Sequence, residues 1–500
     1  MREVVVDGGA LTREEVVAVA RAGVPVRLGD AALDEVAKTR AHVERLAGAD
    51  TPTYGVSTGF GALATRHIPT DRRAALQRSL IRSHAAGAGR PVEPEVVRAL
   101  MLLRLRTLAT GRTGVRPVTV RTLAALLNAD VLPVVHEYGS LGCSGDLAPL
   151  SAVALVLMGE GEVLDRGTLR PAADALRDNG IEPLHLAEKE GLALINGTDG
   201  MLGMLVLAVA DLHRLLDVAD LTAAMSVEAL LGTDRVFADD LQRLRPHPGQ
   251  ARSAARITAL LQDSAIVASH RGPDCNRVQD AYSLRCAPQV HGAARDTVSY
   301  VETVADRELA AAIDNPVVLP DGRVESNGNF HGAPIAYPLD FLAIPVADVA
   351  SMAERRTDRM LDATRSHGLP PFLADDPGVD SGHMIAQYTQ AAIVSELKRL
   401  AVPASVDSIP SSAMQEDHVS MGWSAARKLR TAIDGLTTVL AVELLTAARA
   451  LDLRAPLTPA PATARAVAAL RERVPGPGTD RHLAPEIHAA EQLIREGTLP

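Results

Sequence analysis

The loop over residues 139–150 has the sequence GSLGCSGDLAPL, whose residue types could modify their own backbone. Attack of the Gly145 amide nitrogen on the carbonyl carbon of Cys143 would close a five-membered ring. Loss of water from that ring and from the Ser144 hydroxyl would leave an imidazolone with an exocyclic alkene, an electrophile that no standard side chain supplies. Gly145 suits this cyclisation because it lacks a Cβ and tolerates unusual dihedral angles. The alternative is an ordinary glycine-rich turn before a helix.

Aromatic side chains make up only 2% of the 500 residues, so their positions are informative. Tyr54 lies in the string TYGVSTGFG (residues 53–61), where three glycines surround it. This composition is typical of a mobile binding loop rather than a packed core. The order of the glycines does not match a phosphate-binding loop or a dinucleotide fingerprint.

A second dense string, VQDAYSLRC, covers residues 278–286. Arg285 offers a planar guanidinium that suits a carboxylate. Tyr282 lies three residues earlier, which places it on the same side of a helical turn. The alternative is a helix with an ordinary surface arginine.

Three polar turns follow apolar or glycine-rich stretches. Asn196 ends the apolar run of LALINGT (residues 192–198), and the strings DNP (314–316) and GNFHG (328–332) come later. Taken alone, an asparagine before a glycine is a cap or turn residue.

In their order along the chain, these strings resemble the motifs of the ammonia-lyase and aminomutase family, whose built-in cofactor is 4-methylideneimidazol-5-one (MIO). The resemblance implies that MIO forms from Cys143-Ser144-Gly145, with no external cofactor and no metal. Family members often carry alanine where this chain has Cys143. The fold is then expected to be mainly α, with a long-helix bundle core and a smaller, loop-rich N-terminal lobe that bears the cofactor.

The resemblance also implies roles for other residues. Tyr54 would remove the β-proton of the substrate, and Asn196 would contact the cofactor and the substrate amine. Arg285 would bind the substrate carboxylate. The remaining residues expected to line the site in this part of the chain are Gln279, Tyr282 and Phe330.

Two positions bear on the substrate. Ser83-His84 matches the pair found in histidine-type relatives, whereas phenylalanine-type relatives place apolar residues there. The string QEDHVSM (residues 415–421) also resembles the histidine branch, where the residue matching Glu416 approaches the imidazole. A phenyl ring would leave that carboxylate unpaired. Departures from the usual pattern are Met414, where many relatives have asparagine, and His383, where an apolar or aromatic residue is common.

The expected reaction is therefore the non-oxidative loss of ammonia from L-histidine, which gives trans-urocanate. One alternative is a lyase or aminomutase of the same family that acts on tyrosine or phenylalanine. Another, from a different class, is a thiol hydrolase that uses Cys143 with a histidine such as His136. A non-catalytic structural oligomer is a further alternative.

Composition limits the partners. The net charge of -10, without a cluster of Lys and Arg, disfavours nucleic acid and anionic membranes. The N-terminal residues include no apolar signal segment, and apolar stretches such as residues 201–210 are shorter than a bilayer requires. The three cysteines, Cys143, Cys275 and Cys286, do not suggest a disulfide framework. We expect a cytoplasmic protein with a small-molecule substrate.

The elements that position these residues follow from hydrophobic periodicity. Long helices are expected over residues 201–231, 338–365 and 420–453, with a kink at Pro345. Helices of about 30 residues span about 45 Å, so they are expected to form a bundle and an oligomer core. The resemblance implies a homotetramer with sites shared between subunits. We divide the chain into an N-terminal lobe (1–200) and a helical bundle (201–500).

Shorter elements are expected mainly in the N-terminal lobe. Thr12 and Glu15 form the pattern of a capping box. Residues 93–127 are expected to be largely helical, with strands near residues 4–6 and a hairpin over 163–170. A linker at residues 475–478 precedes a short final helix.

Overall fold

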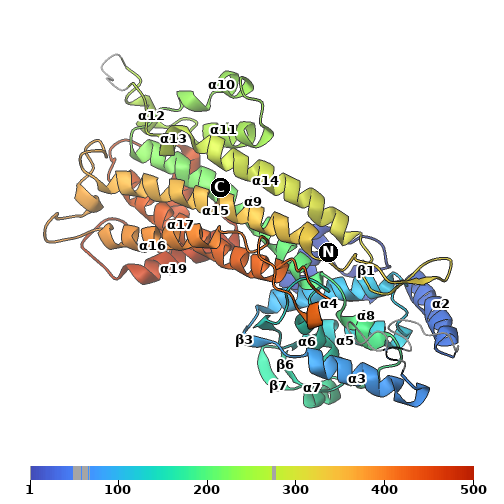
Figure 1. The fold of residues 1–500 in the computed structure, drawn as a ribbon. Helices are drawn as coiled ribbons and strands as arrows, with labels where there is room; N and C mark the ends of the chain where they lie inside the picture. Colours follow the sequence, from blue (N-terminus) through green and yellow to red (C-terminus); the bar gives the residue numbers. More distant parts are fainter. Residues whose placement is uncertain (1, 49–57, 59–65, 67, 273–277) are drawn as a thin grey trace. The chain divides into compact units, whose positions relative to one another are not determined.

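The computed structural model describes the chain except for residues 1, 49–57, 59–65, 67 and 273–277 (Figure 1). Tyr54 and the loop predicted around it lie outside the described residues, as does Cys275. The structure is mainly helical with a few short strands, which confirms the predicted fold class.

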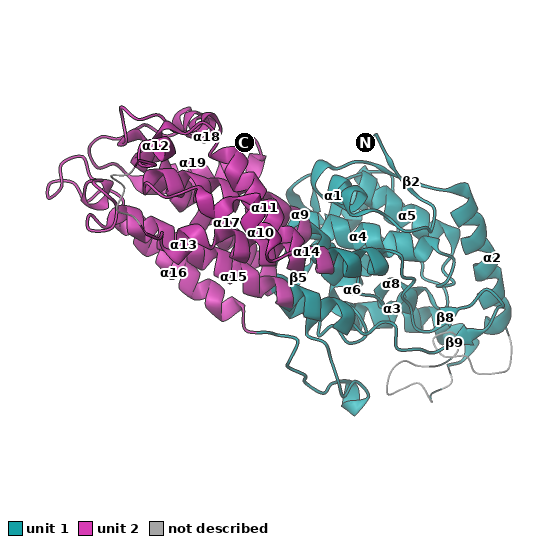
Figure 2. Ribbon diagram, turned by 90° about the horizontal axis from the view of Figure 1, so that it is seen from above, with its two compact units in different colours: residues 1–207, 302–340, 403–427 teal, residues 208–301, 341–402, 428–500 magenta. Residues whose placement is uncertain are grey.

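The chain forms two compact units (Figure 2). Unit 1 comprises residues 1–207, 302–340 and 403–427, and unit 2 comprises residues 208–301, 341–402 and 428–500. This grouping differs from the division at residue 200, because two later segments return to the N-terminal lobe. Their hydrogen bonds explain the return: Gly332 and Ser420 both bond to the carbonyl oxygen of Gly142.

Short helices and small sheets make up much of unit 1. Its helices are α1 (Arg13–Ala22), α2 (Asp30–Ala47), α3 (Arg73–His84), α4 (Pro94–Ala109), α5 (Pro117–Asn128), α6 (Leu147–Leu157), α7 (Ala172–Asp178) and α8 (Glu190–Ile195). Its strand pairs are β1 (Val4–Val6) with β2 (Val26–Leu28), β3 (Ala88–Pro91) with β5 (His136–Tyr138), and β8 (Val317–Val318) with β9 (Val324–Glu325). A three-stranded sheet has the order β4 (Val131–Pro133), β6 (Glu162–Asp165), β7 (Thr168–Pro171).

The core of unit 1 centres on α4, in which every residue from Val96 to Ala109 is buried. A helix buried all round is typical of the interior of a large domain. At the edge of the unit, the predicted capping box of α1 is confirmed, since the Thr12 hydroxyl accepts a hydrogen bond from the Glu15 backbone N–H and the Glu15 carboxylate accepts one from the Thr12 N–H. The predicted strand at Val4–Val6 and the hairpin of β6 and β7 are present.

Four of the five limits between the units fall within long helices, namely α9 (Asp199–Ala229), α14 (Ala287–Leu309), α15 (Ala333–Leu361) and α17 (Gly422–Asp452), and the fifth follows residue 402. Within unit 2 lie α10 (Asp239–Arg243), α11 (Pro248–Leu260), α12 (Ala265–Ala268), α13 (Tyr282–Arg285), α16 (Met384–Leu400), α18 (Pro461–Arg471) and α19 (Leu483–Glu496). The bounds of α9 and α17 lie within two residues of those expected. Helix α15 begins five residues before Pro338 and continues past Pro345; a kink there stays a prediction.

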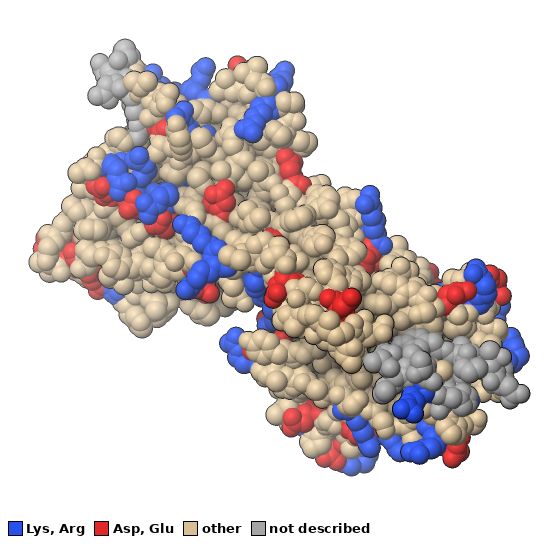
Figure 3. All heavy atoms as spheres, in the orientation of Figure 1, with Lys and Arg blue, Asp and Glu red and all other residues tan. Residues whose placement is uncertain are grey.

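In the part of the chain that the structure describes, three helices are long and apolar enough to cross a membrane by length and composition: Glu190–Ala229, Ala333–Leu361 and Gly422–Asp452. The prediction that apolar stretches such as residues 201–210 are shorter than a bilayer requires is therefore wrong for these helices. Within their most apolar windows, 100%, 61% and 78% of the residues are buried inside the protein. Their apolar side chains are thus largely used for packing. On the face shown in Figure 3, acidic and basic side chains are interspersed.

Candidate active site

The predicted cofactor loop packs directly on the turn that follows Asn196. Gly145 has a φ of 77°, and a Cβ at this position would lie 2.1 Å from the carbonyl oxygen of Gly197. The next residue, Asp146, donates its backbone N–H to the same oxygen at 2.7 Å. Only glycine fits at position 145, because both the backbone conformation and the close approach exclude a side chain.

Asp146 joins the loop to the beginning of helix α9. Its fully buried carboxylate accepts the Ser140 hydroxyl at 2.9 Å and the backbone N–H groups of Gly200 and Met201 at 2.9 and 3.0 Å. These two N–H groups belong to the first turn of the helix, where they have no partner within the helix. Desolvation by burial raises the pKa of Asp146 to about 7, despite these hydrogen bonds.

Segments distant in sequence hold the other side of the loop. The carbonyl oxygen of Gly142 accepts the Ser420 hydroxyl at 2.6 Å and the Gly332 N–H at 3.0 Å. The Met421 N–H donates to the carbonyl oxygen of Leu141 at 2.9 Å. The predicted motif at 328–332 and the one at 415–421 therefore both reach the cofactor loop within unit 1.

Glu416 places its carboxylate against the residues that would form the cofactor. The Ser144 hydroxyl donates to Oε1 at 2.8 Å, and the Cys143 thiol donates to Oε2 at 3.0 Å. A third donor, the Ser411 hydroxyl, reaches Oε2 at 3.0 Å. The structure thus brings together Cys143, Ser144 and Glu416, three of the predicted site residues.

The environment of Cys143 disfavours a nucleophilic thiol. Burial, followed by the contact with Glu416, raises the pKa of the thiol to about 12. Because the thiolate is the nucleophilic form, this cysteine stays unreactive near neutral pH. His136 bonds through Nδ1 to the carbonyl oxygen of Gly89 at 2.9 Å, and within the described residues it makes no hydrogen bond to Cys143.

Asn196 is oriented by the polar turn at 314–316. Its Nδ2 donates to the carbonyl oxygen of Asn315 at 2.9 Å, while its Oδ1 is buried and has no hydrogen-bond partner among the described residues. The side chain of Asn315 in turn accepts the Ser326 hydroxyl and the Asn327 N–H, each at 3.0 Å. A buried acceptor without a partner is uncommon, so Asn196 Oδ1 is suited to a donor from a ligand.

A buried ion pair stabilises the turn at residues 314–316. The Lys189 ammonium bonds to Oδ2 of Asp314, and both side chains are inaccessible to solvent. Asp314 Oδ1 accepts the Asn315 N–H at 2.8 Å. Desolvation lowers the pKa of Lys189 and raises that of Asp314. Nothing in the sequence around Lys189 indicated this pairing, because the partners are 125 residues apart.

Ser83 and His84 end helix α3 and bond locally. His84 Nδ1 lies 2.9 Å from the carbonyl oxygen of Leu80 and 3.0 Å from the Ser83 hydroxyl. Among the described residues, neither side chain forms a hydrogen bond with the cofactor loop or with Glu416. Phe330 is half-buried on the turn that leads to Gly332. The substrate-binding roles of these three residues stay predictions.

Unit 2 carries a second group of predicted residues. Arg285 donates from Nη2 to Oε1 of Gln279 at 2.8 Å, and its guanidinium carbon lies 4.6 Å from the ring centroid of Tyr282. Tyr282 is 70% exposed, and Nε of Arg285 has no hydrogen-bond partner among the described residues. Helix α13 thus confirms the expected placement of Tyr282 and Arg285 on one side of a turn. Gln279 also lines a cavity of about 730 Å³.

The two departures from the family pattern lie in different settings. Met414 is 67% exposed and has a φ of 68°. His383, in unit 2, is buried at the start of α16, and its Nδ1 lies 3.1 Å from the hydroxyl of Thr446. Burial, with the charge of Arg449 as a smaller cause, lowers the pKa of His383 to about 3.

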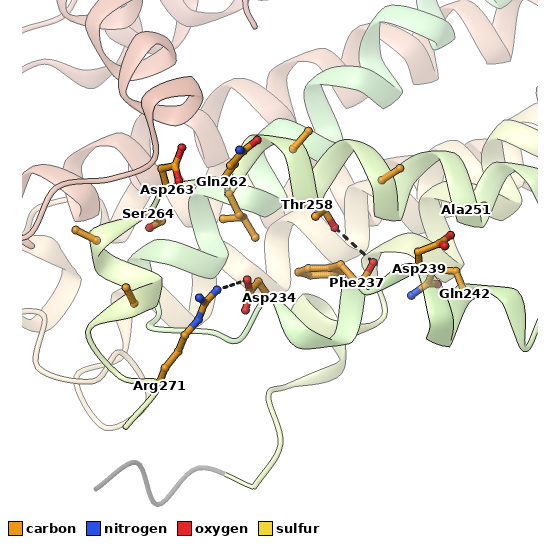
Figure 4. A pocket seen from close by; sticks show the side chains of 15 residues that line it. Asp234, Phe237, Asp239, Gln242, Ala251, Thr258, Gln262, Asp263, Ser264 and Arg271 are labelled. Atoms are coloured by element: carbon orange, nitrogen blue, oxygen red, sulfur yellow. Dashed lines mark hydrogen bonds and ion pairs between the residues drawn. The ribbon is translucent and has the colours of Figure 1, made fainter. Parts of the chain in front are cut away.

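A larger cavity of about 910 Å³ lies in unit 2 between helices α10 to α12 (Figure 4). Asp234 and Arg271 form an ion pair on its wall, and Phe237 and Thr258 also line it. None of the predicted site residues that the structure describes lines this cavity. The larger of these two cavities therefore does not coincide with the predicted active site.

Similarity to known proteins supports the family resemblance that the motifs indicate. The family of aromatic amino acid lyases matches residues 11–472, and the chain belongs to this family. It is 65% identical to the histidine ammonia-lyase of Streptomyces coelicolor, over 100% of this chain and 98% of that protein, and 51% identical to the histidine ammonia-lyase of Gloeobacter violaceus, over 99% and 96%.

Solved structures of the family share the fold. A tyrosine aminomutase from Streptomyces globisporus has a TM-score of 0.94 at 38% identity and covers 99% of this chain and 97% of its own. A histidine ammonia-lyase from Trypanosoma cruzi has a TM-score of 0.91 at 39% identity, with coverage of 99% and 94%.

Proposed function

We propose that the chain is a histidine ammonia-lyase, which converts L-histidine to trans-urocanate and ammonia. Its full-length relatives with this name are up to 65% identical. The structural observation that carries the proposal is the Glu416 carboxylate at 2.8 Å from the Ser144 hydroxyl. This places an acceptor for an imidazole N–H beside the residue expected to become the electrophile.

We infer that Cys143-Ser144-Gly145 forms MIO, and the residues present fit that group. Gly145 already has the positive φ and the close packing on Gly197 that exclude a side chain. The free acceptor of Asn196 lies on the turn packed against the loop. Once formed from these residues, MIO would supply an electrophilic alkene, which activates a substrate amine as a leaving group.

Side chains of the protein would orient the substrate. The Arg285 guanidinium suits its carboxylate, since two parallel N–H groups fit that geometry. Glu416, with His84 as the second predicted contact, would hold the imidazole, and Asn196 would accept a hydrogen bond from the amine. Tyr54 would accept the β-proton. Such positioning contributes much of the rate enhancement when the reactive group is a cofactor.

We further propose a cytoplasmic homotetramer in which subunits share each site. Among the residues that the structure describes, seven aromatic side chains are exposed, with relative exposures from 37% to 70%: Tyr138, Tyr282, Tyr300, Tyr337, Phe341, Phe372 and Tyr388. A chain with so few aromatic residues rarely leaves most of them in water, and exposed aromatic groups are typical of association surfaces. These exposures support association between copies of the chain.

The alternatives differ in what they require. A related lyase or aminomutase for tyrosine or phenylalanine is supported by the likeness to tyrosine aminomutase. The phenyl ring of phenylalanine would leave the carboxylate at position 416 without a donor, whereas the phenolic O–H of tyrosine could donate to it, so competition between tyrosine and histidine decides between them. A thiol hydrolase requires a reactive Cys143, which the raised pKa of its thiol disfavours.

The test measures urocanate formation from L-histidine, with tyrosine and phenylalanine as competing substrates. We expect turnover of histidine alone, its loss in Ser144→Ala, and retention of most activity in Cys143→Ala. Glu416→Gln should lower histidine turnover, whereas Asp417→Asn, a neighbouring exposed acid, should not. Turnover of tyrosine or phenylalanine instead of histidine would overturn the substrate. Loss of urocanate formation in Cys143→Ala with retention in Ser144→Ala would contradict an electrophile formed from Ser144.

A further inference from the structure

The segment that carries Glu416 has an unusual backbone. Ser412, Ala413 and Met414 have φ values of 51°, 53° and 68°, so three consecutive residues other than glycine adopt the left-handed conformation. Such residues normally occur singly, because Cβ approaches the following carbonyl oxygen. All three side chains are exposed, so packing of these side chains does not compensate for the strain in the backbone. Strain of this kind persists where surrounding contacts enforce it, and it is concentrated at functional sites.

The contacts that enforce this turn join its two ends. The Ser411 N–H donates to the carbonyl oxygen of Glu416 at 2.9 Å, and the Glu416 N–H donates back at 3.3 Å. The left-handed turn therefore reverses the chain so that residues 411 and 416 face each other as an antiparallel pair. Farther along, the Val419 N–H donates to the Ser408 hydroxyl at 3.0 Å, which closes the base of the hairpin.

The side chain of Ser411 completes the arrangement. Its hydroxyl donates to Oε2 of Glu416 at 3.0 Å, while Oε1 of the same carboxylate faces the Ser144 hydroxyl at 2.8 Å. The hairpin fixes the backbone of Glu416, and the Ser411 hydroxyl then fixes the rotation of its carboxylate. Ser411 has an extended backbone, with a φ of -140°, and is half-buried.

We propose that Ser411 is the positioning residue for Glu416, and that the left-handed turn Ser412–Met414 is the frame that holds the pair against the cofactor loop. Ser411 acts through the carboxylate and does not itself contact the substrate. The proposal rests on the proposed function only for its kinetic consequence, because the contact between the two side chains exists whatever the substrate is.

The first test compares Ser411→Ala with Ser411→Thr and with Ser381→Ala as the matched control, since Ser381 is an exposed serine of unit 2 outside this turn. Activity on L-histidine is divided by the fraction of processed loop, measured by mass spectrometry. We expect kcat/KM to fall about tenfold or more in Ser411→Ala, as for loss of one hydrogen bond to a charged group. Ser411→Thr should restore it, because it keeps the hydroxyl and suits an extended backbone. If Ser411→Ala fails to fold, Ser411→Cys, which keeps the size but donates weakly, takes its place.

Parental kcat/KM in Ser411→Ala, or an equal loss in Ser381→Ala, would overturn the proposal. A second measurement is independent of any substrate: the thermal midpoints of Ser411→Ala, Glu416→Ala and the double variant. Coupling requires that the double variant lose less than the sum of the single losses, and additive losses would contradict the contact. Coupled midpoints in a protein that does not turn over histidine would overturn the proposed function and leave the role of Ser411 standing.

Discussion

The two groups of predicted site residues are built differently. In unit 1, the side chains of Cys143 and Ser144 both donate to the Glu416 carboxylate. Backbone groups of residues distant in sequence, among them Gly197 and Met421, hold the loop around them. In unit 2, Gln279 and Arg285 share one hydrogen bond and Tyr282 is 70% exposed. The first group is fixed by several hydrogen bonds within one chain, whereas the second leaves one buried donor, Nε of Arg285, without a partner among the described residues.

This difference separates two tasks. Forming a ring from backbone atoms requires groups held at close range before any substrate arrives. Binding a carboxylate requires free donors, and Nε of Arg285 has no partner among the described residues. We therefore expect changes at Ser144 and in the packing of Gly145 to affect processing of the loop, and changes in the unit 2 group to affect substrate affinity.

The largest effect is expected for Gly145→Ala. Its Cβ would meet Gly197 at 2.1 Å, whereas in Gly167, which has a similar φ of 81°, a Cβ would meet no atom within 4 Å. Both variants bear the cost of a left-handed alanine, but only the first displaces the loop. We expect histidine turnover to fall about hundredfold or more in Gly145→Ala and to stay near the parent in Gly167→Ala. Equal activities would show that the packing on Gly197 is unimportant.

Arg285→Gln is expected to have the next largest effect. Loss of a charge-assisted hydrogen bond costs about 1.5–3 kcal/mol, so KM for L-histidine should rise about 10- to 100-fold. The mass of the loop peptide should not change. Arg243→Gln is the control, since Arg243 is an exposed arginine of unit 2 that pairs with Asp239. Unprocessed loop in Arg285→Gln would contradict the separation of tasks.

Buried titratable groups should give the two units opposite responses to pH. Asp146 has its pKa raised to about 7, so the folded state binds a proton that the unfolded state releases. Its contribution to stability falls as pH rises from about 4 to 7, by up to about 1.4 kcal/mol per pH unit. Asp146→Asn should remove this dependence, measured as urea midpoints across that range.

His383 has the reverse sign, because burial lowers its pKa to about 3. The unfolded state binds the proton, so stability is complete above about pH 6.5 and falls as pH decreases toward 3. His383→Gln should therefore lose less stability than the parent between pH 6 and 4, on the same urea assay. An identical acid response in the two proteins would mean that His383 is not the group responsible.

The smallest effect is expected for Met414→Asn. Asparagine tolerates the left-handed conformation better than methionine, and the exposed side chain of Met414 has little packing to lose. We expect a gain of about 1 kcal/mol or less, seen as a thermal midpoint about 1–2 °C higher, with kcat unchanged. A lower midpoint would indicate that the turn is not strained at this position.

Sequence patterns predicted the long helices well, because their hydrophobic faces repeat over many turns. The bounds of α9 and α17 differ from the expected ones by no more than two residues. Residues 93–127 are largely helical, as predicted, and form two helices, α4 and α5, separated by Gly111 and Gly114, which have φ values of 67° and 77°. Their positive φ is incompatible with a continuous helix, and the position of these glycines was the available signal.

For the site, the motifs indicated which residues carry chemistry but not what holds them. Glu416 was predicted, whereas Ser411 was not, since a serine in a polar loop has no distinctive pattern. The same applies to Lys189 and Asp314, whose pairing depends on a contact across 125 residues. Contacts of this kind, which hold the site residues in place, depend on tertiary packing and cannot be predicted from the local sequence.

The most direct test of the account is the mass of the peptide that contains Cys143-Ser144-Gly145, compared between the parent and Ser144→Ala. Formation of MIO removes two waters, so the parent peptide should be lighter by that amount than its sequence requires, whereas the Ser144→Ala peptide has no hydroxyl to eliminate and should not lose two waters. A parent peptide of unmodified mass, from protein that still turns over L-histidine, would contradict a self-made electrophile as the basis of the activity.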